Sequence, residues 1–232
     1  MQKTAAKSKL YTCKYCDKSF KRENTLVVHL CEKKRRWQEK DEKGVRVGFN
    51  TYGKFYQYTQ HSTKPKTNMD FIKSPYYKAF VKFGRYCVSI NAINIERFIE
   101  FIIKQGKKLD YWTSDKLYTE YLMALIVTEN PIDTVTRAIK YSMKWGEDNE
   151  ASSNDILRYG NTNAICYAIT TGHISPWVLY NCDSGGTFIN ALSSEQTEII
   201  WDFINPDIWT LKLRDYPDDV NYIKEILSKA GW

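Results

Sequence analysis

The sequence lacks long apolar stretches and is poor in several residues that mark common functional classes. Its longest uninterrupted apolar run, Tyr121 to Val127, is too short to span a bilayer or to form the hydrophobic part of a secretory signal. Histidine occurs only three times, the glycines form no phosphate-binding loop motif, and no internal repeat of fixed period is present. We therefore expect an intracellular protein without a membrane partner.

Apolar residues nevertheless make up 43% of the 232 residues, and aromatic residues make up 15%. This composition is sufficient for a folded core, and it excludes wholesale disorder and a collagen-like fibre. The length is that of one or two domains.

The net charge of +7 conceals an uneven distribution of charge along the chain. Residues 1–108 contain 25 Lys and Arg against 9 Asp and Glu, whereas residues 109–232 contain 9 against 18. The first 40 residues alone contain 12 basic and 4 acidic residues. Such asymmetry indicates contact with nucleic acid or a membrane surface on the basic side.

Six cysteines in a chain without a secretory signal do not indicate a disulfide framework. Three of them lie within the first 31 residues, beside His29. Two residues separate Cys13 from Cys16, and twelve separate Cys16 from His29. A Cys-x2-Cys turn presents two thiolates to one ion, and a helix that begins near Arg22 brings His29 to the same side. This clustering predicts a metal site.

Residues 11–31 closely resemble a C2H2-type zinc finger, since they also have Tyr11 before the first cysteine and the apolar pair Phe20 and Leu26. The resemblance implies a small ββα fold with Zn2+ bound by Cys13, Cys16 and His29. Three apolar side chains are too few to fold such a segment, so metal binding must supply the folding free energy, about 10–16 kcal/mol in finger peptides.

The fourth ligand departs from the family pattern, because Lys33, Lys34 and Arg35 stand where a second histidine is expected. Cys31 is the nearest substitute, but two positions on a continuous helix differ by about 200°. Cys31 can therefore reach the ion only if the helix ends at or just after His29. His61, Cys87 or an incomplete site are the alternatives.

The family resemblance also implies which side chains face nucleic acid. Carried over through Leu26 and His29, the base-contacting positions are Arg22, Thr25 and Val28, with Asn24 as an auxiliary. Arg22 can pair with guanine, whereas Thr25 and Val28 are permissive, so direct readout of sequence would be poor. One finger covers about 3 base pairs.

The run Lys33, Lys34, Arg35 and Arg36 follows the finger immediately and adds four consecutive cations. If all four contacted phosphates, the logarithm of the affinity would fall with the logarithm of the salt concentration at a slope of roughly −3.6. The interpretation is salt-sensitive, non-specific binding to DNA, or less favourably to RNA.

Residues 41–90 form a second, basic and aromatic segment, in which eleven rings between Phe49 and Tyr86 are interleaved with lysines. Such a composition suits a surface that stacks bases and follows phosphates. The rings also recur at helical spacing, and Ser74-Pro75 is typical of a helix start. We therefore expect helices that bury most of these rings, with the lysines outward.

Residues 91–232 form the third segment, which we expect to be mainly helical. Amphipathic helices are predicted over 95–103 and 115–128, and strand-like residues occur in 177–180 and 208–213. The expected fold is mainly α: a small ββα finger in residues 1–40, then a larger helical domain with at most a small sheet.

No constellation of residues indicates catalysis. Asp207 and Lys212 lack a second acid at the expected spacing, and His173 has no neighbouring Cys or Ser partner. The hypothesis is a non-enzymatic, zinc-binding, nucleic-acid-associated protein whose helical domain provides protein contacts. The alternative is a structural or assembly protein whose finger docks a protein partner or only stabilises the fold.

The Lys, Asn, Ile and Tyr richness of the chain is consistent with an AT-rich phage or viral coding sequence. The protein would then act in the cytoplasm or nucleoid, or in the host cytoplasm if it is phage-encoded.

Overall fold

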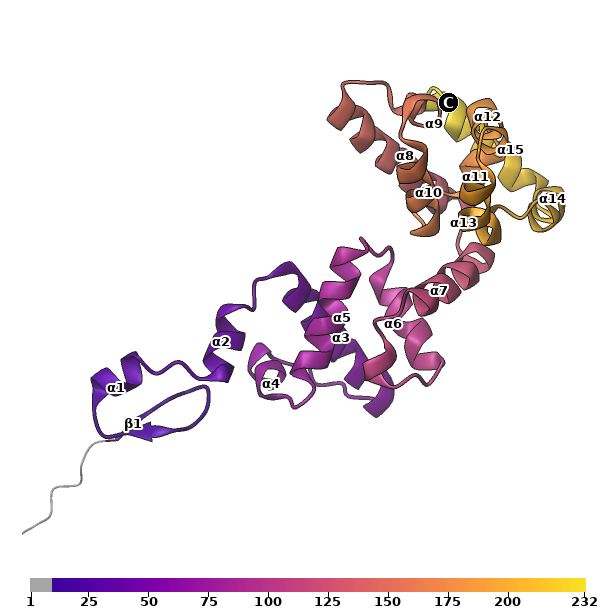
Figure 1. The fold of residues 1–232 in the computed structure, drawn as a ribbon. Helices are drawn as coiled ribbons and strands as arrows, with labels where there is room; N and C mark the ends of the chain where they lie inside the picture. The colour runs from indigo at the N-terminus through magenta and orange to yellow at the C-terminus, as the bar shows by residue number, and fades with distance from the viewer. Residues whose placement is uncertain (1–9) are drawn as a thin grey trace, which may run out of the picture. The chain divides into compact units, whose positions relative to one another are not determined.

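The structure is a computed structural model that describes residues 10–232, apart from the side chain of Val127. The chain divides into two compact units, one that ends at Thr113 and one from Ser114 to Trp232 (Figure 1). Both boundaries expected from the sequence, after residues 40 and 90, lie inside the first unit, and residues 1–9 lie outside the described part of the chain. Helices dominate, and the described sheet has two short strands, which confirms the mainly-α prediction.

The first unit begins with a small ββα segment, here called the finger segment (residues 10–31), and continues into a helical body (residues 32–113). The finger segment contains β1 (Tyr11–Thr12), β2 (Ser19–Phe20) and α1 (Glu23–Val27). The helical body contains α2 (Glu32–Gln38), α3 (Lys43–Gln60), α4 (Asn68–Lys73), α5 (Tyr77–Ser89), α6 (Ile95–Lys104) and the 3-10 turn η1 (Leu109–Tyr111).

The second unit is built from helices and short helical turns. These are α7 (Asp115–Thr128), α8 (Pro131–Asn149), η2 (Ser153–Asp155), α9 (Ile156–Tyr159), α10 (Thr162–Thr170), α11 (Pro176–Leu179), α12 (Asp183–Asn190), α13 (Ser194–Ile204), α14 (Pro206–Asp215) and α15 (Pro217–Lys229). The helices predicted over 95–103 and 115–128 are confirmed as α6 and α7.

The core of the helical body is aromatic. Phe80 is fully buried, and its ring centroid lies 5.6 Å from those of both Tyr52 and Phe55. Trp112 closes this cluster, and its indole N–H donates to the carbonyl of Lys107 at 2.9 Å, so its polar atom is satisfied although the ring is buried. Five of the eleven rings between Phe49 and Tyr86 are buried, four are half-buried, and Tyr58 and Tyr76 are exposed, so the segment supplies a core but buries fewer rings than expected.

Glycines allow α3 and α5 to cross at close range. A Cβ atom on Gly48 of α3 would lie 2.7 Å from the carbonyl oxygen of Phe80, and one on Gly84 of α5 would collide with the backbone of Gly44. Any larger residue at these positions would separate the two helices. Gly53, also on α3, differs because nothing lies within 4 Å of the Cβ position.

The strand predictions for residues 177–180 and 208–213 are wrong, since residues 177–179 lie in α11, with Tyr180 as its C-cap, and residues 208–213 lie in α14. Both helices begin with a capping residue followed by proline: the Ser175 hydroxyl accepts from the backbone N–H of Trp177, and Asn205 accepts from that of Asp207. These two helix-start signals outweigh the strand propensity of the aromatic and β-branched residues that follow. The buried ring of Trp209 then packs edge-on against Trp177.

Two side chains considered for catalysis have clear structural surroundings in the second unit. The amine of Lys212 lies 5.5 Å and 5.4 Å from the ring centroids of Trp177 and Trp209, and it donates to the carbonyl of Ile126. Burial lowers the pKa of Lys212. The ring of His173 stacks on Tyr141 at 5.4 Å. Lys212 thus packs against Trp209 of its own helix and Trp177 of α11.

Candidate metal centre

The first two candidate ligands lie on a tight hairpin. Strands β1 and β2 pair antiparallel, with Tyr11 opposite Phe20. Between them the backbone N–H of Cys13 donates to the carbonyl of Lys18 at 2.9 Å, and that of Asp17 donates back to Cys13 at 2.8 Å. Asp17 adopts a positive φ of 61°, which turns the chain sharply after Cys16. This turn places both cysteine sulfurs on one side.

Helix α1 ends early enough to release His29 and the residues that follow it. Its last residue is Val27, and the backbone N–H of His29 donates to Leu26 at 3.2 Å in a tighter, three-residue turn. The Nε2 atom of His29 then lies 3.3 Å from the sulfur of Cys16, while its ring packs on Phe20 with centroids 4.8 Å apart. Phe20 therefore orients the imidazole toward the sulfurs.

Cys31 completes the group and also caps the next helix. It is the N-cap residue of α2, in extended conformation, and its sulfur accepts a hydrogen bond from the backbone N–H of Lys34 at 3.4 Å. The Lys34 amine donates to the carbonyl of His29 at 3.2 Å, which ties the end of α1 to the start of α2. The break between the two helices is the geometry that a His-x-Cys ligand pair requires.

The ligand atoms of Cys13, Cys16, His29 and Cys31 all lie within 4.8 Å of one another, so this group could hold a metal ion. The prediction that these four residues come together is confirmed. The two alternative ligands are elsewhere: Cys87 is buried in α5, and His61 is exposed in the loop after α3.

The three thiols influence one another's ionisation. Burial, the largest influence, raises the pKa of Cys13, but hydrogen bonds from the backbone of Tyr15 and Cys16 and from neighbouring thiols outweigh it, so the pKa lies below its ordinary value. A backbone hydrogen bond at Lys18 lowers the pKa of Cys16, but burial and the other two cysteines together raise it above the usual value. Close thiolates repel one another, and a bound cation would remove that cost.

The finger segment has almost no core apart from these ligands. Within residues 10–31 the one buried residue is Cys13, and Tyr11, Phe20 and Leu26 are only partly covered. Such a segment cannot bury enough apolar surface to offset the entropy of ordering its backbone. A bound metal ion would supply the missing stabilisation.

Contacts to α2 and α4 hold the finger segment against the helical body. The ring of Tyr15 packs on Trp37 with centroids 5.9 Å apart, and Asp17 lies 3.6 Å from the amine of Lys73. Within the body, the Arg36 guanidinium of α2 donates to the carbonyl of Ile72 at 2.8 Å and stacks 4.4 Å from the ring centroid of Tyr77, which anchors α2 to α4 and α5. Sequence reasoning missed this anchoring role because nothing local distinguishes Arg36 from the cations beside it.

The structure places the predicted nucleic-acid contacts in two groups. Arg22, Asn24, Thr25 and Val28 are all exposed on and beside α1. In the basic run, Arg35 is exposed and Lys33 is half-buried, and neither forms an ion pair within residues 10–232. Lys34 and Arg36 instead donate to backbone carbonyls of the protein itself.

A cleft of about 690 Å³ between α2 and α5 carries further cations that the sequence prediction did not single out as a site. Lys78, Lys82 and Arg85 line it from α5, at helical spacing, and Arg35 lines it from α2. Arg85 is paired with Glu42 at 2.6 Å, and Lys78 lies 3.7 Å from Glu32. Lys82 has no ion pair in the described part of the chain.

Comparison with known proteins returns no matching family model, no matching curated protein and no matching solved structure. No helix in residues 10–232 is long and apolar enough to cross a membrane. The site is thus defined by its own geometry: a cluster of three cysteines and one histidine, attached to a helical body with a cationic surface.

Proposed function

We propose that the chain is a zinc-binding protein that associates with nucleic acid, with DNA preferred to RNA. The observation that carries the proposal is the Cys13, Cys16, His29 and Cys31 cluster. Two exposed cations flank it, Arg22 just before α1 and Arg35 in α2. Three thiolates and one imidazole in a four-ligand group are the donors that structural zinc sites use. The proposed role is binding, without a catalytic step.

The available cations support salt-sensitive contact with phosphates. Arg22, Lys33 and Arg35 have no ion pair within the described residues, whereas Lys34 and Arg36 are engaged internally. Three phosphate contacts correspond to a slope of roughly −2.7 in log affinity against log salt, from about −0.9 for each contact. This slope is shallower than the slope of roughly −3.6 expected if all four cations of the run contacted phosphates.

The test measures binding of the zinc-loaded full chain to a short DNA duplex at a series of salt concentrations. Fluorescence anisotropy of the labelled duplex is the readout. We expect the affinity to fall with salt and to be lost when a chelator removes the metal. Arg35→Gln should make the slope less steep by about 0.9, whereas Lys107→Gln, an exposed lysine away from the finger segment, should leave it unchanged. Binding that is absent, or that survives metal removal unaltered, would overturn the proposal.

Protein docking is the second candidate, and the exposed apolar residues of the finger segment favour it. Val27, Val28 and Leu30 are 67%, 78% and 56% exposed around the end of α1. Grouped apolar side chains on a surface mark interaction sites. This candidate predicts that the metal-loaded protein binds no duplex even at low salt and that Arg35→Gln has no effect on its function.

A further inference from the structure

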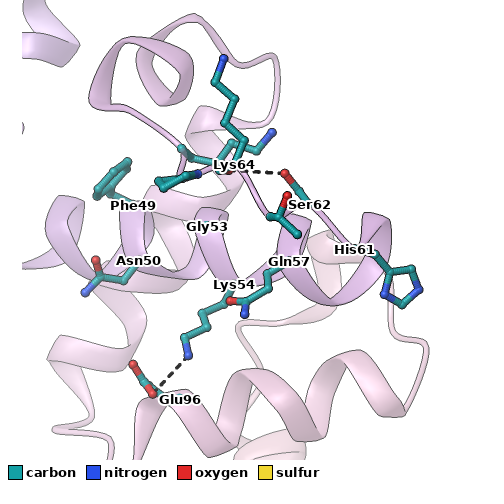
Figure 2. A pocket seen from close by; sticks show the side chains of 12 residues that line it. Phe49, Asn50, Gly53, Lys54, Gln57, His61, Ser62, Lys64 and Glu96 are labelled. Atoms are coloured by element: carbon teal, nitrogen blue, oxygen red, sulfur yellow. Dashed lines mark hydrogen bonds and ion pairs between the residues drawn. The ribbon is translucent and has the colours of Figure 1, made fainter.

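A second site lies on the helical body, in a cleft of about 740 Å³ between α3 and the loop of residues 61–66 (Figure 2). Asn50, Lys54 and Gln57 of α3 line one side, and Ser62 and Lys64 of the loop line the other. This volume is in the range of clefts that hold small-molecule ligands and cofactors.

Gly53 forms the floor of this cleft and has no packing role. It lies inside α3, where glycine is destabilising relative to alanine. Gly44 and Gly48 on the same helix are required by the close approach of α5, but nothing lies within 4 Å of a Cβ atom on Gly53. The absence of a side chain at Gly53 therefore leaves open space in the cleft. Such space allows a ligand to approach the helix backbone closely.

Both ends of the loop that forms the other side are fixed. His61, which also lines the cleft, ends α3 in a left-handed conformation with φ 50°. At the other end, Thr67 and Asp70 form a reciprocal capping box at the start of α4. The Ser62 hydroxyl donates to the carbonyl of Lys64 at 3.4 Å across the loop. The loop is thus short and fixed at both ends, and it forms a defined side of the cleft.

Three lysines line the cleft against one carboxylate. The Lys54 amine is held 3.4 Å from Glu96, and the Lys66 amine is held 4.6 Å from the ring centroid of Tyr56. Lys64 is exposed and forms no ion pair within residues 10–232. Lysine is a common phosphate-binding residue, and an anion in the cleft would compete with Glu96 for Lys54.

The remaining lining residues suit a nucleoside rather than a bare anion. Phe49 packs on Phe71 with centroids 5.7 Å apart and stays partly open to the cleft, where a base can stack on it. The amides of Asn50 and Gln57 make no hydrogen bond within the described residues, so they are available to the polar edge of a base.

We propose that this cleft binds a nucleotide, with its phosphate among Lys54, Lys64 and Lys66 and its base beside Phe49, either as a free nucleotide or as one unit of a nucleic-acid strand. The proposal concerns residues outside the finger segment and does not depend on contacts of Arg22 or Arg35. A failure of duplex binding by the finger segment therefore leaves it standing.

The test is calorimetric titration of the zinc-loaded full chain with three probes: inorganic phosphate, ATP and a ten-nucleotide oligothymidine. ATP binding assigns a free nucleotide, and binding of the oligonucleotide alone assigns a strand. Binding of inorganic phosphate alone, or of none of the three, overturns the proposal.

Variants then locate the binding. The double variant Lys64→Ala/Lys66→Ala should lose affinity tenfold or more, since each charge-assisted contact contributes about tenfold. The matched control Lys107→Ala/Lys108→Ala removes equal charge from another exposed segment and should retain most of the affinity.

Glu96→Gln should raise the affinity severalfold by removing the competing anion. Gly53→Leu should abolish binding while the melting temperature is maintained, because the added side chain enters open space. Equal affinities for the two double variants, or unaltered binding by Gly53→Leu, would refute the assignment.

Discussion

The finger segment and the helical body behind it are ordered by different physical means. Within residues 10–31 Cys13 alone is buried, whereas α3 and α5 bury Tyr52, Phe80 and Phe83 among other residues. Apolar burial contributes roughly 1.5–3 kcal/mol for each large side chain, so the body can support its own fold. The finger segment has four candidate ligands in place of a core, and we therefore expect its order to depend on a metal ion.

The largest expected effect follows from removing that ion. Chelation, or Cys16→Ser, should unfold residues 10–31, because metal binding contributes about 10–16 kcal/mol in finger peptides and little else orders this segment. Hydrogen exchange should show full loss of protection in residues 10–31 and retained protection in α3 and α5.

Cys182→Ser is the matched control. Its sulfur, which is not part of the ligand group, donates to the carbonyl of Val178, and a serine hydroxyl can replace it. We expect this variant and the unaltered chain to bind the same amount of zinc, one equivalent. Protection of residues 10–31 that persists after complete metal removal would show that the two regions do not differ in the way described.

The reverse experiment removes part of the core. Phe80→Ala should destabilise the helical body by about 3–5 kcal/mol, because it deletes a fully buried ring that contacts Tyr52, Phe55 and Trp112. Denaturant unfolding followed by tryptophan fluorescence measures this loss. Zinc stoichiometry should remain unchanged under native conditions, since Phe80 is outside the ligand group. A loss of zinc equal to that of Cys16→Ser would show that the finger segment depends on the body.

The metal ligands could be predicted from the sequence because their signal is local. The spacing from Cys13 to His29 constrains one hairpin and one helix. Cys31 was the nearest candidate for the fourth ligand, and helix geometry required only that the helix end near His29. The structure adds the reason that the helix stops: Cys31 begins a new helix, and Lys34 bridges the two. A spacing pattern cannot show that a candidate ligand also caps a helix.

Other features depend on contacts between residues distant in the sequence. Arg36 resembles its neighbours in the basic run, yet Ile72 and Tyr77 determine its role. The cleft at Gly53 likewise requires α3 and the loop of residues 61–66 together. The strand predictions for α11 and α14 were wrong for a different reason. Ser175-Pro176 and Asn205-Pro206 are local signals for a helix start, and the strand predictions rested only on the aromatic and β-branched residues that follow them.

The smallest expected effect separates packing from helix propensity within the body itself. Gly53→Ala should stabilise the protein by about 0.5–1 kcal/mol, because an alanine favours the helix and its Cβ meets no neighbour. Gly48→Ala has the same propensity gain but places a Cβ 2.7 Å from the Phe80 carbonyl, so it should destabilise by about 1–3 kcal/mol through overpacking. Chemical denaturation of both variants measures the difference. Changes of opposite sign in the free energy of unfolding are expected if the crossing of α3 and α5, rather than the helix propensity of α3, stabilises the body. Equal stabilisation by both substitutions would contradict the close packing at Gly48.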